Sequence, residues 1–148
     1  MDIKYREARK SDIERINELF IEMLKAIYRT DDVDGYEEGY LERFFDNNED
    51  CIYVAESQEG IVAFLSVQVY RDEGYIYFDD LSVSEKFRDH GVGTKLIEMA
   101  EAYAKEIGIK VIVFHVEKSN ARAHELYYRL GYEDNEDQGN RMRMVKEI

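Results

Sequence analysis

Two glycines spaced two apart, Gly91 and Gly93, stand in the stretch KFRDHGVGTKL (residues 86–96), which has basic side chains and leads into a predicted helix. Glycine tolerates backbone conformations that allow several amide groups to face one point. A helix N-terminus also carries a partial positive charge, and the two features together favour a bound anion, a phosphate in particular. These residue types therefore predict a phosphate-binding cradle at residues 88–94.

Two common phosphate-binding motifs do not fit this stretch. A P-loop requires G-x-x-x-x-G-K-[ST], which His90 to Lys95 do not supply. A dinucleotide fingerprint requires a third glycine, where Leu96 stands. The remaining alternative is a turn that Gly91 and Gly93 shape without any ligand, so the surrounding elements and motifs must decide.

The first fifty residues predict a strand and two helices. Residues 3–8 read as a short strand, and Ser11 with Glu14 matches the capping box that opens a helix. Apolar residues at three-and-four spacing continue from there to Ile27, which predicts one buried helix face. Tyrosine, leucine and phenylalanine residues indicate a second helix over residues 36–45.

The middle of the chain predicts three strands. Residues 51–57, 61–71 and 75–83 are rich in β-branched and aromatic side chains. Short turns that contain glycine separate them, which is typical of an antiparallel meander. The glycine stretch with its helix therefore follows directly after the third of these strands.

Helices and strands alternate in the last third. The helix after the glycine stretch is predicted to end at Gly108, and the apolar run at residues 109–116 predicts a strand covered on both faces. Another helix opens near Asn120 and ends at Gly131, before an alternating strand at residues 141–148 that closes a late hairpin. The order β-α-α-β-β-β-α-β-α-β-β indicates a mixed α/β (α+β) fold, and 148 residues suffice for one domain over 1–148.

Three segments together resemble the GNAT superfamily of acetyltransferases. RDHGVG (88–93) is similar to the R-x-x-G-x-G signature, DDLSV (79–83) to the end of the fourth strand, and NARAHELYYRLGY (120–132) to the N-x-x-A-x-x-L-Y-x-K-x-G-F segment. The resemblance implies a single GNAT-like domain whose mostly antiparallel sheet splays between strands four and five. The motifs lie in residues 51–148, and the first fifty residues match only by element order. Departures from the family pattern occur at Glu85, Asp89, His90 and Arg129.

The resemblance implies that acetyl-CoA is the co-substrate. Its pantetheine arm would pair with strand backbone, and its pyrophosphate would meet amides at the helix N-terminus. Asn120 would contact the pantetheine arm, cap its own helix, or do both. The implied acetyl-CoA contacts are Leu81, Ser82, Val83, Arg88, Asp89, His90, Gly91, Val92, Gly93, Thr94 and Asn120. Candidates to meet the outer phosphates are Arg88, Lys95, Arg122 and Arg129.

The implied reaction is acetyl transfer from a thioester to a primary amine. An alkylammonium group with a pKa of about 10.4 must lose a proton before it attacks, so a base is needed. Asp79, Asp80 or a water chain could serve, and strand alternation predicts that the two carboxylates point to opposite faces. Tyr127 matches the position of the family's general acid, which would protonate the departing thiolate, whereas Tyr128 does not.

Charge gives the main indication of the acceptor. The net charge is −13, which disfavours nucleic-acid binding. Residues 31–50 hold nine acids against the single base Arg43, and this region lines the acceptor side in the GNAT fold. An acidic region attracts cations. DDLSV also resembles the strand end of polyamine and diamine acetyltransferases, and the two features predict that the acceptor is a small cationic amine such as a polyamine. Protein N-termini or lysines, or a non-catalytic acyl-CoA sensor, are the alternatives.

The remaining residue types suggest little further chemistry. Cys51 is the only cysteine, and the chain shows neither a signal-peptide pattern nor an apolar run of membrane-spanning length. A cytoplasmic protein without a membrane partner is therefore expected. His90, His115 and His124 share no metal-ligand spacing, so no metal is expected. A homodimer is left open as the assembly.

Overall fold

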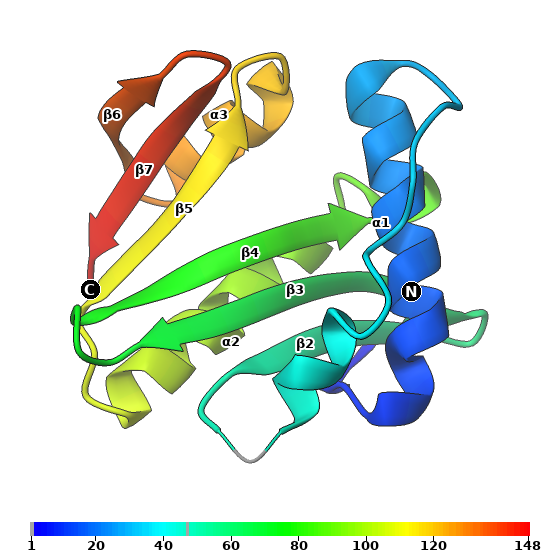
Figure 1. The fold of residues 1–148 in the computed structure, drawn as a ribbon, viewed down its shortest axis with the longest axis horizontal. Helices are drawn as coiled ribbons and strands as arrows, with labels where there is room; N and C mark the ends of the chain where they lie inside the picture. Colours follow the sequence, from blue (N-terminus) through cyan, green and yellow to red (C-terminus); the bar gives the residue numbers. More distant parts are fainter. Residues whose placement is uncertain (1, 47) are drawn as a thin grey trace.

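The computed structural model describes residues 2–46 and 48–148, which form one mixed sheet with helices on both faces (Figure 1). The strands are β1 (Lys4–Glu7), β2 (Cys51–Ser57), β3 (Gly60–Tyr70), β4 (Tyr75–Val83), β5 (Val111–Glu117), β6 (Glu133–Gln138) and β7 (Arg141–Glu147). The helices are α1 (Ile13–Tyr28), α2 (Val92–Glu106) and α3 (Ala121–Arg129). The strand order is β1-β2-β3-β4-β5-β7-β6, and every neighbouring pair is antiparallel except β4 and β5.

Each face of the sheet has its own apolar core. Helix α2 packs on one face through Leu96, Ile97 and Ala100, which are almost fully buried, and α3 contributes to the same core. Helix α1 covers the other face through Ile16 and Leu19. Figure 1 shows α2 behind the strands and α1 in front of them. The apolar residues that recur at three-and-four spacing in the sequence therefore form the buried faces of α1 and α2.

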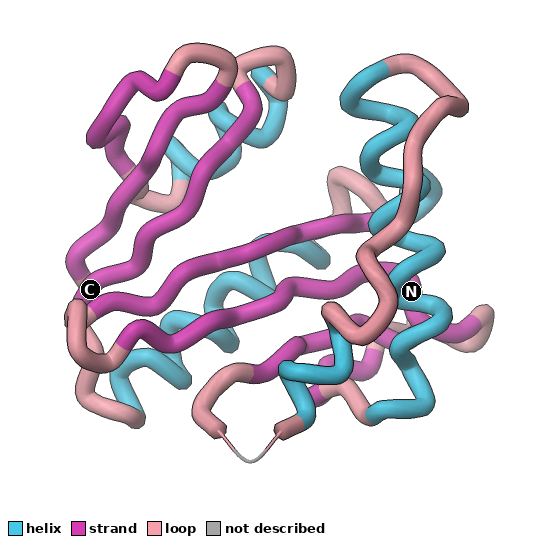
Figure 2. Tube along the Cα trace, viewed as in Figure 1, coloured by secondary structure: helices cyan, strands magenta, loops and turns pink. Residues whose placement is uncertain are grey.

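Strands β4 and β5 pair over only three residues. The parallel register joins Ile76 with Ile112 and Phe78 with Phe114, after which the strands diverge. Strand β4 continues to Val83 and β5 to Glu117 without pairing with each other. Figure 2 shows this V-shaped opening in the middle of the sheet. The predicted mixed α/β fold, with a mostly antiparallel sheet that splays between the fourth and fifth strands, is confirmed.

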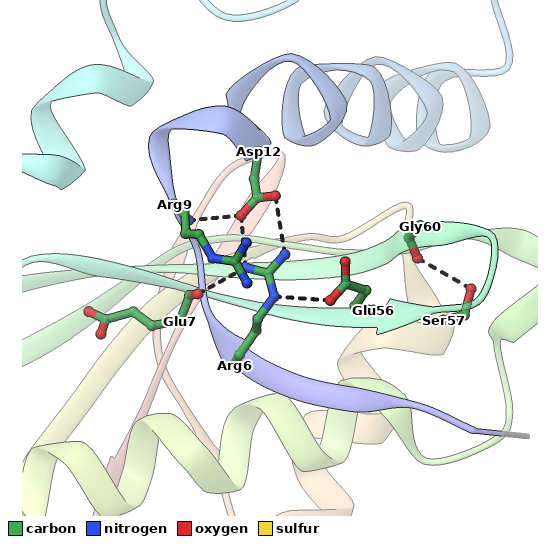
Figure 3. A network of polar contacts seen from close by, with 7 residues as sticks. All are labelled: Arg6, Glu7, Arg9, Asp12, Glu56, Ser57 and Gly60. Atoms are coloured by element: carbon green, nitrogen blue, oxygen red, sulfur yellow. Dashed lines mark hydrogen bonds and ion pairs between the residues drawn. The ribbon is translucent and has the colours of Figure 1, made fainter.

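A polar network fastens the start of α1 to the edge of the sheet (Figure 3). The Arg6 guanidinium donates to Asp12 at 2.9 and 3.2 Å and to Glu56 at 3.1 Å. Asp12 also accepts from the Arg9 amide at 2.8 Å, and the Arg6 hydrogen bonds hold the pKa of Asp12 below its usual range. The predicted capping box of Ser11 and Glu14 is wrong, because the 3₁₀ turn Lys10–Asp12 precedes α1 and the Asp12 side chain caps that turn.

The predicted second helix is shorter than expected. Residues 36–45 contain only the 3₁₀ turn Leu41–Phe45. The Tyr36 amide donates to the Asn17 side chain at 2.8 Å, and the Tyr36 ring stacks on Phe20 with centroids 3.8 Å apart. Contacts with α1 thus replace the intrahelical hydrogen bonds that the sequence pattern suggested.

Candidate active site

The opening between β4 and β5 leads into a cleft of about 780 Å³. Its walls come from the C-terminal half of α1, the diverging halves of β4 and β5, the loop and first turn of α2, and one side of α3 from Arg122 to Arg129. Every site residue expected from the sequence lines this cleft except His90, which is exposed outside it. Lys95, a candidate for the outer phosphates, also lies outside the lining.

A β-bulge in β4 determines where the two acids point. Leu65 of β3 pairs with Leu81, whereas Val67 pairs with Phe78, so two β4 residues stand opposite one β3 residue. That β3 residue is buried Ser66, whose hydroxyl accepts from the Asp80 amide at 3.0 Å. Such an extra residue interrupts the alternation of a strand.

Both carboxylates therefore lie on the α1 side of the sheet. The Tyr36 hydroxyl donates to Asp80 at 2.6 Å, and the Tyr40 hydroxyl donates to Asp79. The Tyr36 and Tyr40 rings stack with centroids 5.0 Å apart, so the two acids are held by one aromatic pair. The prediction that Asp79 and Asp80 point to opposite faces is wrong, because it assumed a strand without a bulge.

Burial shifts the protonation of this pair. Desolvation, followed by the charge of Asp79, raises the pKa of Asp80 to about 7, while the hydrogen bond from Tyr36 opposes the shift. Desolvation also raises the pKa of Asp79, which the Tyr40 hydrogen bond and the Arg43 charge oppose. A carboxylate with a pKa near neutrality is matched to a general base at neutral pH. The pair can therefore accept a proton where an ordinary aspartate would be too weak a base.

The two tyrosines of α3 occupy different environments. Tyr127 is 8% exposed, lines the cleft and packs on Phe114 with ring centroids 4.3 Å apart. Burial raises the pKa of Tyr127, and the charge of Asp80 adds to the shift, so its phenol keeps its proton. Tyr128 is 48% exposed and donates instead to Asp134. Of these two tyrosines, Tyr127 lines the cleft and Tyr128 does not.

The glycine stretch forms the entrance to α2. Gly91 is the N-cap with φ of +78°, in the left-handed region that favours glycine. Gly93 lies against β4, where an added Cβ would come 3.5 Å from Val83 and 3.8 Å from Leu81. The first turn of α2 contains no acidic residue, and the amides of a first helical turn have no intrahelical partner. This geometry fits a phosphate at the helix N-terminus, as expected for the pyrophosphate of acetyl-CoA.

Basic residues surround this cradle on the lining of the cleft. Arg88 donates through Nε to the Val83 carbonyl at 3.0 Å, and Arg129 comes from α3. Arg122 of α3 forms an ion pair with Asp89, so the carboxylate that departs from the family pattern is compensated by a cation. A polyanion at this site would therefore meet positive charge from both the loop and α3.

The β4 residues that are expected to meet the pantetheine arm can offer it mainly backbone amide and carbonyl groups. The Ser82 hydroxyl is buried and donates to the Leu19 carbonyl of α1 at 3.0 Å, so the side chain faces away from an arm lying between the strands. The edge of β4 beyond Phe78 has no β5 partner, which leaves it open to a strand-like ligand. Asn120 caps α3, where its side chain accepts from the Ala123 amide at 3.3 Å.

The sequence did not identify several residues that contact the acids or line the cleft. The residue pattern predicts a helix that includes Tyr36 and Tyr40, whereas in the structure both precede the 3₁₀ turn and donate to Asp80 and Asp79. The Tyr77 hydroxyl lies 2.5 Å from His115 Nδ1, which links β4 to β5 near the point of divergence, and both residues line the cleft. No sequence motif marks these contacts, because their partners lie far apart in the chain.

Comparison with known proteins identifies the family. Residues 18–132 match the acetyltransferase (GNAT) family. An uncharacterized N-acetyltransferase of Bacillus subtilis, YhfO, is 30% identical over 134 residues, which cover 87% of this chain and 89% of that protein. The chain therefore belongs to the GNAT acetyltransferase family, and it is an acetyl-CoA-dependent N-acetyltransferase.

Solved structures share the fold across the whole chain. The crystal structure of PaiA N-acetyltransferase from Thermoplasma acidophilum in complex with coenzyme A has a TM-score of 0.85 at 20% identity and covers all of both chains. The ribosomal-protein-S18-alanine N-acetyltransferase from Escherichia coli has a TM-score of 0.79 at 16% identity, covering 99% of this chain and 94% of that one. Because both identities are low, these likenesses show the fold alone.

Within residues 2–46 and 48–148, no three His, Cys, Asp or Glu side chains are grouped to hold a metal ion. No helix in these two ranges is long and apolar enough to cross a membrane. The cytoplasmic location and the homodimer stay predictions.

Replacement of Gly91 tests the cradle. Gly91→Val forces a β-branched residue to a φ of +78°, so we expect acetyl-CoA binding to weaken by about 1 to 3 kcal/mol, measured by calorimetry. Gly74→Val is the matched control, because Gly74 has φ of +82° and equally open surroundings but lies in the β3–β4 turn outside the cleft. Equal loss of affinity in both variants would argue against a cradle at Gly91.

Proposed function

We propose that this N-acetyltransferase acts on a small primary amine, with Asp80 as the base and Tyr127 as the acid. The observation that carries the proposal is the partly buried Asp80 carboxyl, which accepts a hydrogen bond from Tyr36 and whose pKa is raised to about 7, in the same cleft as the Tyr127 phenol. Asp80 supplies a base of suitable strength for an ammonium ion, and Tyr127 supplies a proton on the side of α3.

The proposed reaction moves one acetyl group and two protons. Asp80, directly or through one water, takes a proton from the substrate ammonium, and the free amine attacks the thioester carbonyl carbon. A C–N bond forms and the C–S bond breaks, so the electron pair leaves with the thiolate sulfur. The Tyr127 phenol gives that sulfur its proton and is reprotonated by the second proton that the attacking nitrogen loses as the tetrahedral intermediate collapses. Asp80 then returns its proton to solvent.

Electrostatics favours a cationic acceptor. The exposed acids between residues 31 and 38 do not line the cleft. They lie on the segment whose Tyr36 and Tyr40 donate hydrogen bonds to Asp80 and Asp79. A negative surface beside the cleft raises the local concentration of cations, and Asp79 can hold an ammonium next to Asp80. These features support a polyamine as the acceptor class, with amino groups of proteins as the alternative.

A turnover assay tests the proposal. Release of free thiol from acetyl-CoA is followed with polyamines, simple alkylamines and peptides that carry a free N-terminus or lysine. We expect the highest kcat/KM with polyamines and a rise in their KM at high ionic strength, because salt screens exposed acids. Turnover of peptides but not of small amines would favour the alternative, and no turnover with any amine would refute the proposed function.

The pH dependence tests Asp80. The base must be deprotonated, so kcat/KM is expected to fall roughly tenfold per pH unit as the pH drops below about 7. Tyr36→Phe removes the hydrogen bond that lowers the pKa of Asp80. The acid limb of the profile should therefore move to higher pH in this variant. Tyr75→Phe, on the same strand as Asp80 but outside the cleft lining, should leave the profile in place, and an unmoved limb in Tyr36→Phe would argue against Asp80.

The leaving-group step tests Tyr127. Tyr127→Phe removes one oxygen and little volume, so kcat should fall roughly 100-fold while acetyl-CoA affinity survives. Tyr128→Phe is the control on the same helix, and it should lose far less activity because Tyr128 faces Asp134. Steady-state kinetics with calorimetric affinity separates the two effects. If both variants lose activity equally, the thiolate takes its proton from another source.

A further inference from the structure

Glu117 is a carboxylate in the cleft that the proposed chemistry does not use. It is the last residue of β5 and lines the cleft on the wall opposite β4. Its side chain accepts a hydrogen bond from the Tyr28 hydroxyl of α1 at 3.1 Å. Because β4 and β5 are parallel and diverge after Phe78 and Phe114, their C-terminal ends stand apart. Glu117 is therefore separated from Asp79 and Asp80 by the opening itself.

The carboxylates of the two walls face the same side of the sheet. Asp79 and Asp80 reach Tyr40 and Tyr36 of the segment that follows α1, and Glu117 reaches Tyr28 at the end of α1. A molecule lying under the C-terminal half of α1 could contact both walls at once. The cleft thus presents acidic groups at two separated points on its acceptor side.

The surface of α1 over this part of the cleft is largely apolar. Met23, Leu24 and Ile27 line the cleft and are only partly buried. Their side chains offer hydrocarbon to a ligand and no charge of either sign. A ligand that suits this arrangement has a hydrocarbon middle and a cation at each end.

We propose that Glu117 is a specificity-determining residue that binds the distal ammonium of an α,ω-diamine. The inference rests on the proposed function, in which the proximal amine is deprotonated by Asp80. The distal ammonium pairs with Glu117 in place of the Tyr28 hydroxyl, while the methylene chain contacts α1. The substrate class is thereby narrowed from primary amines to diamines and the polyamines built from them.

Two cations, Arg29 at the end of α1 and Arg141, also line the cleft and would oppose a distal ammonium. Arg141 stands opposite Glu117 in the β5–β7 register, and among the described residues it has no ion-pair partner. A guanidinium there repels a distal ammonium and would attract a distal carboxylate. Arg141→Gln should therefore raise kcat/KM for a diamine, whereas an amino-acid acceptor held by Arg141 would lose kcat/KM in the same variant.

A matched pair of amines tests the inference. Putrescine and n-butylamine have the same carbon chain and differ by one ammonium group. In the wild type, kcat/KM should be higher for putrescine, and Glu117→Gln should lower the putrescine to n-butylamine ratio roughly fivefold, mainly through KM. Glu125→Gln removes the same charge from the exposed side of α3 outside the cleft, so it should leave the ratio unchanged.

The possible outcomes separate this inference from the proposed function. Thiol release with neither amine would contradict the proposed function itself. Turnover of both amines with a ratio that Glu117→Gln does not change would overturn the role of Glu117 alone. A loss of activity in Arg141→Gln toward amino acids, with no gain toward putrescine, would assign the distal end of the cleft to a carboxylate.

Discussion

The short parallel pairing of β4 and β5 is the constraint on which this protein depends. Three paired residues hold the strands together, and each strand then continues alone. The unpaired edge of β4 is a cost in a folded protein unless another group satisfies it. A strand-like ligand can supply that group, so the fold keeps this edge open. The cradle of α2, the tyrosine of α3 and the acids of β4 all border the same opening.

The bulge in β4 brings two carboxylates together on one face of the sheet, where two tyrosine hydroxyls bind them. Two carboxylates this close in a partly dry site do not both ionise easily, and burial raises the pKa of both. Tyr36 and Tyr40 donate to them, which limits the shift without neutralising the acids. The result is an Asp80 whose pKa is about 7, beside an Asp79 whose pKa is also raised. A regular strand would have sent one of them to the opposite face.

The protein also binds a polyanion despite a net charge of −13. Salt screens the repulsion between a phosphate and distant acidic residues. The binding energy of a phosphate in contact with amides and guanidinium groups therefore depends mainly on these nearest neighbours. We propose the amides of the first turn of α2 and the arginines of the cleft as these neighbours. Exposed acids elsewhere leave this local field intact, and they suit the proposed cationic acceptor.

The sequence by itself determined most of the helices and strands and placed the glycine stretch at the start of α2, because glycine placement, apolar period and motif spacing are local properties. The glycine stretch, Tyr127 and the meander were all found this way, with strands at 51–57 and 75–83 predicted to the residue. Tertiary structure alone decided the bulge, the tyrosines on the two acids and the position of Glu117. These depend on which distant segments meet: Tyr36 lies 44 residues from Asp80, and Tyr28 lies 89 from Glu117. Local periodicity carries no information about such partners, because their contacts form only when the whole sheet has closed around them.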